Sequence, residues 1–392
     1  MNRFPVALIL AALLAGFLAD PACAQIASDS VPAPGNVGSA AYPRLHPDRS
    51  VSFQIKAPSA QRVVLRGGAG LVNDALPMER GENGIWAVRT PPAAPGFHYY
   101  WFEVDGLNVQ DPASYSYFGY GRETSGVEVP DEDGAFYQPR QDIPRGTVRE
   151  HWYFSEITGK WRRSHVYCPA EYDRKTRSRY PVLYLQHGAG ENERGWVEQG
   201  RANFILDGLI ASGAARPMIV VCDSGYAMAR NAPPSTNAWT APIAAFEDVL
   251  LKELIPSIDD DFRTRTGRED RAMAGLSMGG MQTLGIALKH LDRFAWIAAM
   301  SAPPRQGFEV ATAYDGVFRD SARFNREVCL LWLGAGTAEE RFLAGTKTMH
   351  EALAAAGIPS VLYASPGTDH EWQTWRRSLR DLAPRLFRRA SQ

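Results

Sequence analysis

The sequence has almost no net charge of either sign. Its 42 lysines and arginines nearly balance its 43 aspartates and glutamates, which leaves a formal net charge of −1 over 392 residues. Proteins that bind nucleic acid or sit on anionic membranes rely on a basic excess, because they must neutralise phosphate groups. We therefore expect neither nucleic acid nor a membrane as a partner.

Cysteine is scarce, with four residues in the chain. None of them belongs to a Cys/His cluster with metal-ligand spacing, so the sequence predicts no metal site. Cys222 and Cys329 lie in apolar runs typical of strands. This position predicts small buried core residues rather than nucleophiles or disulfide partners.

Apolar runs long enough to cross a membrane are also missing, and the N-terminus holds a shorter one at residues 6–18. Arg3 precedes this run, and the small residues 22–24 follow it. The pattern is typical of a secretory signal peptide that is removed after residue 24, so we expect a periplasmic or secreted protein. A lipoprotein modified at Cys23 is the alternative, which Asp20 disfavours because a lipobox has an apolar residue there.

The remaining chain changes character twice. Residues 25–40 are small and contain proline and glycine, which predicts a flexible lead-in. Short alternating runs between turn signals then fill residues 41–129, as in SVSFQI and HYYWFEV, and they favour a small all-β sandwich. A polar, proline-containing stretch at 130–146 predicts a linker.

Residues 147–392 have the pattern of a mixed α/β domain. After a starting antiparallel pair of strands, near-continuous apolar runs such as YPVLYLQHG and VCLLWLGAG alternate with helical segments such as TKTMHEALAAAG. Strands that are apolar throughout are buried on both faces, which indicates a mostly parallel sheet with helices on each side.

The most informative motif is GLSMG at residues 275–279, between a predicted strand and a predicted helix. Glycines on either side of Ser277 permit a turn tight enough to lift its hydroxyl above the edge of the sheet. A simple glycine-rich turn would give the same letters, so the rest of the chain must decide. A nucleophilic serine needs a histidine base and an acid that orients it, in the order serine, acid, histidine along such a fold.

The chain order serine, acid, histidine helps to select one of the eight histidines as the base. Only three histidines follow Ser277, and two of them, His290 and His350, lie in helical segments where a surface or packing role is expected. His370 remains, in the loop that leaves the last predicted strand. Because catalytic groups of open α/β sheets gather at the carboxyl ends of the strands, His370 is the predicted base.

The acid and the oxyanion donors follow from the same reasoning. The loop after VCLLWLGAG offers Glu339 and Glu340, and we favour Glu339 with Glu340 as the alternative. The backbone amide of Met278, next to the serine, is one expected donor to the oxyanion. Small residues at 188–190 permit close backbone approach, and we expect the second donor to be the amide of Ala189.

Three motifs of this sequence resemble those of a known family. YPVLYLQHGAGENERGW, RAMAGLSMGGMQT and GTDHEWQTWRRSL are similar to the esterase D and enterochelin esterase-like α/β-hydrolases, which include carbohydrate esterase family one. SVSFQIKAPSAQRVVL and HYYWFEVDGLNVQDP resemble the immunoglobulin-like modules that precede such domains in bacterial feruloyl and acetyl-xylan esterases. The resemblance implies an α/β-hydrolase fold with Ser277 as nucleophile and His370 as base. The sequence departs from the family pattern at GAGTAEER, which has glutamates where the arrangement Gly-x-x-Asp is commoner.

The resemblance also implies a function. Feruloyl or acetyl esters on plant cell-wall polysaccharide would be hydrolysed through an acyl-serine, without a metal or organic cofactor. Trp196, Trp239 and Trp372 lie in predicted loops at the catalytic edge. They are candidates to stack on an aromatic acyl group or a sugar, with buried packing as the alternative for each. Two rival functions are a siderophore trilactone esterase and a catalytically inactive protein that binds glycan.

Overall fold

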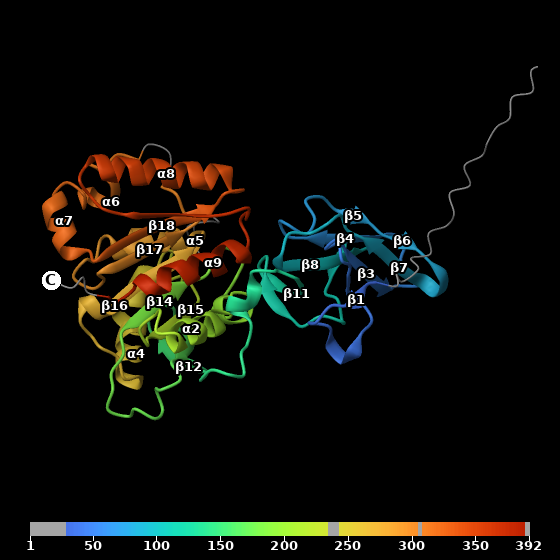
Figure 1. The fold of residues 1–392 in the computed structure, drawn as a ribbon, viewed down its shortest axis with the longest axis horizontal. Coiled ribbons are helices and arrows are strands. Elements are labelled where there is room, and N and C mark those ends of the chain that lie inside the picture. The colour runs from blue at the N-terminus through green and yellow to red at the C-terminus, as the bar shows by residue number, and fades with distance from the viewer. Residues whose placement is uncertain (1–28, 234–242, 305–307, 389–392) are drawn as a thin grey trace, which may run out of the picture.

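The computed structural model describes residues 29–233, 243–304 and 308–388. The predicted signal peptide and Trp239 therefore lie outside the described residues. Within them, the chain forms an N-terminal β module and a larger α/β domain that lie side by side (Figure 1). No helix in the described ranges is long and apolar enough to cross a membrane.

The N-terminal module consists of two antiparallel sheets. The first has the order β1 (Val31–Pro32), β2 (Arg44–Leu45), β3 (Val51–Lys56), β7 (Ile85–Arg89) and β6 (Glu79–Arg80). The second has the order β10 (Tyr117–Gly119), β11 (Arg122–Val129), β8 (Gly96–Val104), β4 (Val63–Gly67) and β5 (Leu76–Pro77), with β9 (Leu107–Val109) paired to β8.

Alternation along the strands builds the core of this module. In β3, Val51 and Phe53 are buried while Ser52 and Gln54 are partly exposed, as expected for a strand with one face on a core. Aromatic and branched side chains from both sheets, among them Tyr100, pack together between them. The strand β1 lies within the predicted lead-in, so part of that segment belongs to the sandwich because it pairs with β2.

The α/β domain is built on one sheet of eight strands. Their order is β12 (Thr147–Ser155), β13 (Lys160–Cys168), β15 (Ile219–Asp223), β14 (Val182–Gln186), β16 (Arg271–Leu276), β17 (Trp296–Met300), β18 (Leu330–Gly336) and β19 (Val361–Ser365). β12 and β13 pair antiparallel, β13 also runs antiparallel to β15, and the strands from β15 to β19 are parallel. The predicted fold class is confirmed.

Helices cover both faces of this sheet. One core, on the first face, contains side chains of α2 (Ala202–Ala211) and α9 (Trp372–Leu382). The core on the opposite face contains side chains of α3 (Phe246–Val249), α4 (Ile255–Asp261), α5 (Met278–Ala287) and α8 (Glu340–Ala355). The short helices α1 (Gly195–Glu198), α6 (Ala313–Gly316) and α7 (Ser321–Glu327) lie in the connections.

One of the two cysteines predicted to be buried lies at the surface. Cys222 is buried in β15 as predicted, but Cys329 is exposed, which corrects the expectation of a core thiol. The reason is its position: β18 begins one residue later, at Leu330, so Cys329 precedes the buried part of its apolar run. Between α3 and α4 the helical geometry changes, because residues Leu250–Leu254 form a π-helical segment.

Candidate active site

Ser277 occupies the single residue between β16 and α5. Its backbone has φ 50° and ψ −115°, a strained conformation for a residue with a side chain. A Cβ on Gly275 would lie 2.4 Å from the backbone of Gly279, and one on Gly279 would lie 2.5 Å from the carbonyl oxygen of His187. Both glycines are therefore required for the tight turn that exposes the serine hydroxyl.

Glu339 and His370 meet Ser277 at the carboxyl ends of the parallel strands. His370 Nε2 lies 3.1 Å from Ser277 Oγ, and His370 Nδ1 lies 2.5 Å from Glu339 Oε1. The side chain of Glu339 is fully buried, whereas Glu340 is exposed. The structure thus brings together the serine, the histidine and the first of the two glutamates. An imidazole with a carboxylate at Nδ1 keeps its proton there and leaves the Nε2 lone pair facing the serine.

Further side chains hold this arrangement and were not found from the sequence. Ser301 Oγ donates to Glu339 Oε2 at 2.8 Å and accepts from Trp375 Nε1 at 3.1 Å. The ring of Phe342 stacks on that of His370, with ring centroids 4.6 Å apart. Ser301 had one usable signal, since it is a polar residue directly after an apolar strand on the catalytic edge.

One predicted oxyanion donor, Met278, follows the serine directly, and the other, Ala189, lies in a loop that passes close to it. Met278 is the first residue of α5, so its amide has no partner within the helix and the positive end of the helix dipole is nearby. A Cβ on Gly188 would lie 3.5 Å from Ser277 Cβ, so the loop that carries Ala189 runs against the serine. His187, just before this loop, accepts from the Gly225 amide, and burial lowers its pKa to about 4, which keeps it neutral.

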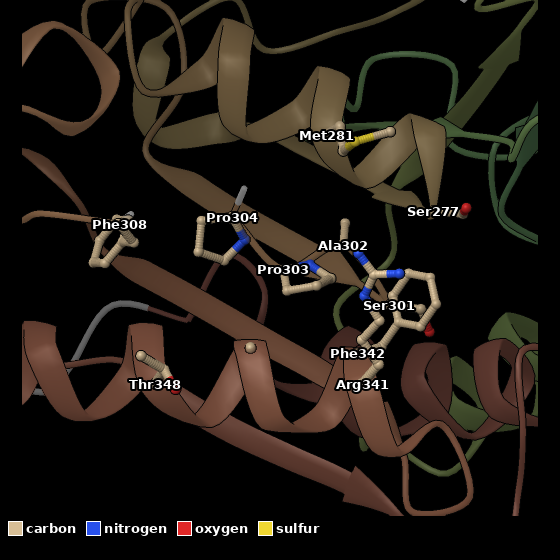
Figure 2. A pocket seen from close by; sticks show the side chains of 11 residues that line it. Ser277, Met281, Ser301, Ala302, Pro303, Pro304, Phe308, Arg341, Phe342 and Thr348 are labelled. Carbon is tan, nitrogen blue, oxygen red and sulfur yellow. The ribbon is translucent and has the colours of Figure 1, made fainter. Parts of the chain in front are cut away.

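A cavity of about 600 Å³ opens beside Ser277. Figure 2 shows Met281 on α5 and Phe342 on α8 on opposite sides of it, with Pro303 between them. Arg341 is the one charged residue among the described residues that line it. A second cavity of about 180 Å³ lies where the β module meets the other side of His370, and Tyr120 and Ala189 are among its lining residues.

Two of the tryptophans predicted to contact substrate, Trp196 and Trp372, are absent from the described lining of the larger cavity. Trp196 is fully buried in α1 and donates to the Gln186 carbonyl at 2.9 Å, and Trp372 is 1% exposed at the start of α9. Their rings meet edge to face, with centroids 5.4 Å apart. Trp372 lines the second cavity, but the near-complete burial of both rings corrects that expectation in favour of packing. The sequence placed both residues in loops, but each belongs to a helix that turns it inward.

The fold and the geometry together define the class. A serine at a strained strand–helix turn, with an acid and a histidine later in the chain at the same sheet edge, is the arrangement of α/β-hydrolases. The model of the Esterase family matches residues 155–386, which is more than half of the chain. The protein therefore belongs to this family.

Several relatives and solved structures are similar to it. An endo-1,4-beta-xylanase/feruloyl esterase of Xylanibacter ruminicola is 38% identical over 365 residues, covering 92% of this chain and 48% of the relative. The chain thus spans about half of that relative's length. A ferulic acid esterase of Anaeromyces mucronatus has a TM-score of 0.55 at 24% identity, covering 66% of this chain and 96% of that one. The enterobactin esterase of Shigella flexneri has a TM-score of 0.58 at 18% identity, covering 85% and 93%. These two structures share the fold.

Proposed function

We propose that this protein is a serine esterase that hydrolyses feruloyl or acetyl esters on plant cell-wall polysaccharide. The observation that carries the proposal is the chain of hydrogen bonds from Glu339 through His370 to Ser277, beside a cavity of about 600 Å³. Likeness to the xylanase/feruloyl esterase of X. ruminicola over nearly the whole chain supports the substrate class.

The reaction follows from the positions of these atoms. His370 Nε2 takes the proton of Ser277 Oγ as the oxygen attacks the ester carbonyl carbon. The amides of Met278 and Ala189 stabilise the negative oxygen of the tetrahedral intermediate. The imidazolium then protonates the departing alcohol and leaves an acyl-serine. Water, deprotonated by the same nitrogen, releases the acid and restores the serine, while Glu339 stays ionised and holds the imidazole tautomer.

The cavity favours an aromatic acyl group over acetyl. Its volume lies within the range of about 300–1,000 Å³ typical of pockets that enclose a drug-sized ligand, and an acetyl group has only three heavy atoms. Met281, Pro303, Phe308 and Phe342 supply an apolar lining suited to a hydroxycinnamoyl ring. Arg341 is the one cation among the lining residues that the structure describes, and a highly anionic trilactone would need a more cationic lining than these residues form.

The proposal is tested by comparing kcat/KM for methyl ferulate, 4-nitrophenyl acetate and enterobactin. We expect methyl ferulate to be the best of the three substrates. Ser277→Ala should lower kcat by about 10⁶-fold, as removal of a serine nucleophile does elsewhere. Ser212→Ala, at an exposed serine that ends α2, is the matched control and should retain full activity.

Two results would contradict the proposal. A clear preference for enterobactin would favour the trilactone esterase, and equal rates for wild type and Ser277→Ala would favour an inactive binding protein.

We also propose export, on the pattern of residues 1–24. The N-terminal sequence of protein recovered from the periplasm or medium would begin at Gln25, whereas an intact Met1 on that protein would contradict export.

A further inference from the structure

The loop that carries Ala189, residues 188–191, is held in shape by a buried glutamate that takes no part in the reaction. Glu191 Oε2 accepts from the Gly188 amide at 3.1 Å, and the Glu191 amide faces the Gly188 carbonyl at 3.3 Å. These two contacts close residues 188–191 into a turn with Ala189 at its tip. The position of the Ala189 amide against Ser277 therefore depends on where the Glu191 carboxyl is held.

A tyrosine of the N-terminal module holds that carboxyl. Tyr99, in β8, has its hydroxyl 3.0 Å from Glu191 Oε1. The same hydroxyl accepts from Gln199 Nε2 at 2.7 Å and from Trp372 Nε1 at 3.1 Å. Both lone pairs of the hydroxyl are then used, so its one proton must be donated, and Glu191 is the nearest acceptor. Glu191 can consequently accept from Tyr99 but cannot donate to it.

The module contacts the same loop a second time. The Gly121 amide, at the turn between β10 and β11, donates to the Gly190 carbonyl at 2.8 Å. Gly190 has φ +80°, and a Cβ there would lie 3.2 Å from Tyr120 Cα. The loop is thus held between its own domain and the module, and a side chain at Gly190 would be both strained and tightly packed.

From these contacts we propose that Tyr99 is a positioning residue for the oxyanion hole, so that the N-terminal module is a working part of the catalytic site. The inference rests on the proposed acyl-serine chemistry but requires only ester hydrolysis, whichever ester is the natural substrate. Burial raises the pKa of Glu191 to about 7, in agreement with a carboxyl that depends on these few donors for its charge.

Tyr99→Phe is the direct test, because it removes the hydroxyl and keeps the ring contacts with Phe97 and Tyr120. A displaced oxyanion donor weakens the transition state more than the bound substrate, so we expect kcat for 4-nitrophenyl acetate to fall about ten- to a hundredfold with KM changed less than about threefold. Inhibition by a trifluoromethyl ketone, which forms an oxyanion on Ser277, should weaken by the same factor as kcat/KM.

Glu128→Gln is the matched control. Glu128 on β11 binds Arg376 of α9 at 2.6 and 3.0 Å, so it also joins the module to the α/β domain, but it does not contact residues 188–191. We expect this variant to lower Tm while kcat stays within about twofold. A merely structural role for Tyr99 would give the same pattern in Tyr99→Phe, namely a lower Tm with normal kcat, and that result would overturn the inference.

A double-mutant cycle with Glu191→Gln provides a second measurement if Tyr99→Phe folds poorly. The glutamine amide has to face either the Tyr99 hydroxyl or the Gly188 amide, both donors, so Glu191→Gln should itself lower kcat about ten- to a hundredfold. Because both changes interrupt the same series of contacts from Tyr99 through Glu191 to Gly188, the double variant should be no slower than the slower single one. Multiplying effects would contradict the inference. A wild type that hydrolyses no ester would overturn the proposed function as well, whereas an active wild type with an equally active Tyr99→Phe would overturn the inference alone.

Discussion

Replacing Glu339 by glutamine tests the site more sharply than removing the serine. Glu339 Oε2 receives two donors, the Gly336 amide at 2.5 Å and the Ser301 hydroxyl at 2.8 Å. A glutamine must therefore keep its carbonyl oxygen on this side and turn its amide toward His370. That amide donates to Nδ1 and so stabilises the tautomer with its proton on Nε2, which cannot accept a proton from Ser277.

The expected loss is large. An amide in place of a triad carboxylate costs about 10⁴-fold in kcat where the wrong tautomer results, which is about 5 kcal/mol of transition-state stabilisation. Glu340→Gln is the matched control, because Glu340 is the next residue and is exposed, and we expect it to act like wild type. The assay is kcat for 4-nitrophenyl acetate at pH 7, with circular dichroism to verify folding. A folded Glu339→Gln variant within tenfold of wild type would refute this reasoning, as would an equal loss in Glu340→Gln.

Two more predictions concern stability. In Gly279→Ala the added Cβ would lie 2.5 Å from a backbone carbonyl oxygen, so the free energy of unfolding should fall by about 1–3 kcal/mol or more, and Tm should fall with it. Gly285→Ala, in the same helix, has open space around its Cβ. The same thermal melt should show that this second variant is as stable as the wild type or more stable. Burial lowers the pKa of His187 to about 4, so this residue binds a proton more readily in the unfolded chain than in the folded protein. Lowering the pH from about 6.5 to about 4 should therefore reduce the free energy of unfolding by about 3 kcal/mol through His187. Urea unfolding of wild type and His187→Gln should show their difference narrowing over this pH range, and a constant difference would contradict the assignment.

Sequence reasoning was most effective where the topology restricts the geometry. Ser277 and His370 are 93 residues apart, yet chain order in a mostly parallel sheet was enough to single them out, because successive loops emerge at one edge. Choosing between Glu339 and Glu340 was harder. Neighbouring residues at a helix start differ only in which way they face, and that direction depends on donors from the ends of β17 and β18.

Contacts between distant elements could not be predicted in this way. Trp196 and Trp372 were assigned to loops, and their burial depends on two helices that pack against each other across about 175 residues of chain. Cys329 has an apolar neighbourhood in sequence but lies just outside the strand. In each case the residue type gave a useful hypothesis, but the sequence neighbours did not show whether the side chain is buried. Burial of a ring or a thiol depends on side chains from other helices and strands.

The link between the module and the catalytic edge shows the same limit at the level of domains. Tyr99 lies in a strand whose residues read as sandwich core, and the family match begins only at residue 155. A buried carboxylate without a cation is stable only when hydrogen-bond donors replace water. Glu191 obtains one donor from its own loop and another from a tyrosine 92 residues earlier, and only the second depends on how the module sits. A shift of the module against the α/β domain therefore changes the support of the loop that faces Ser277.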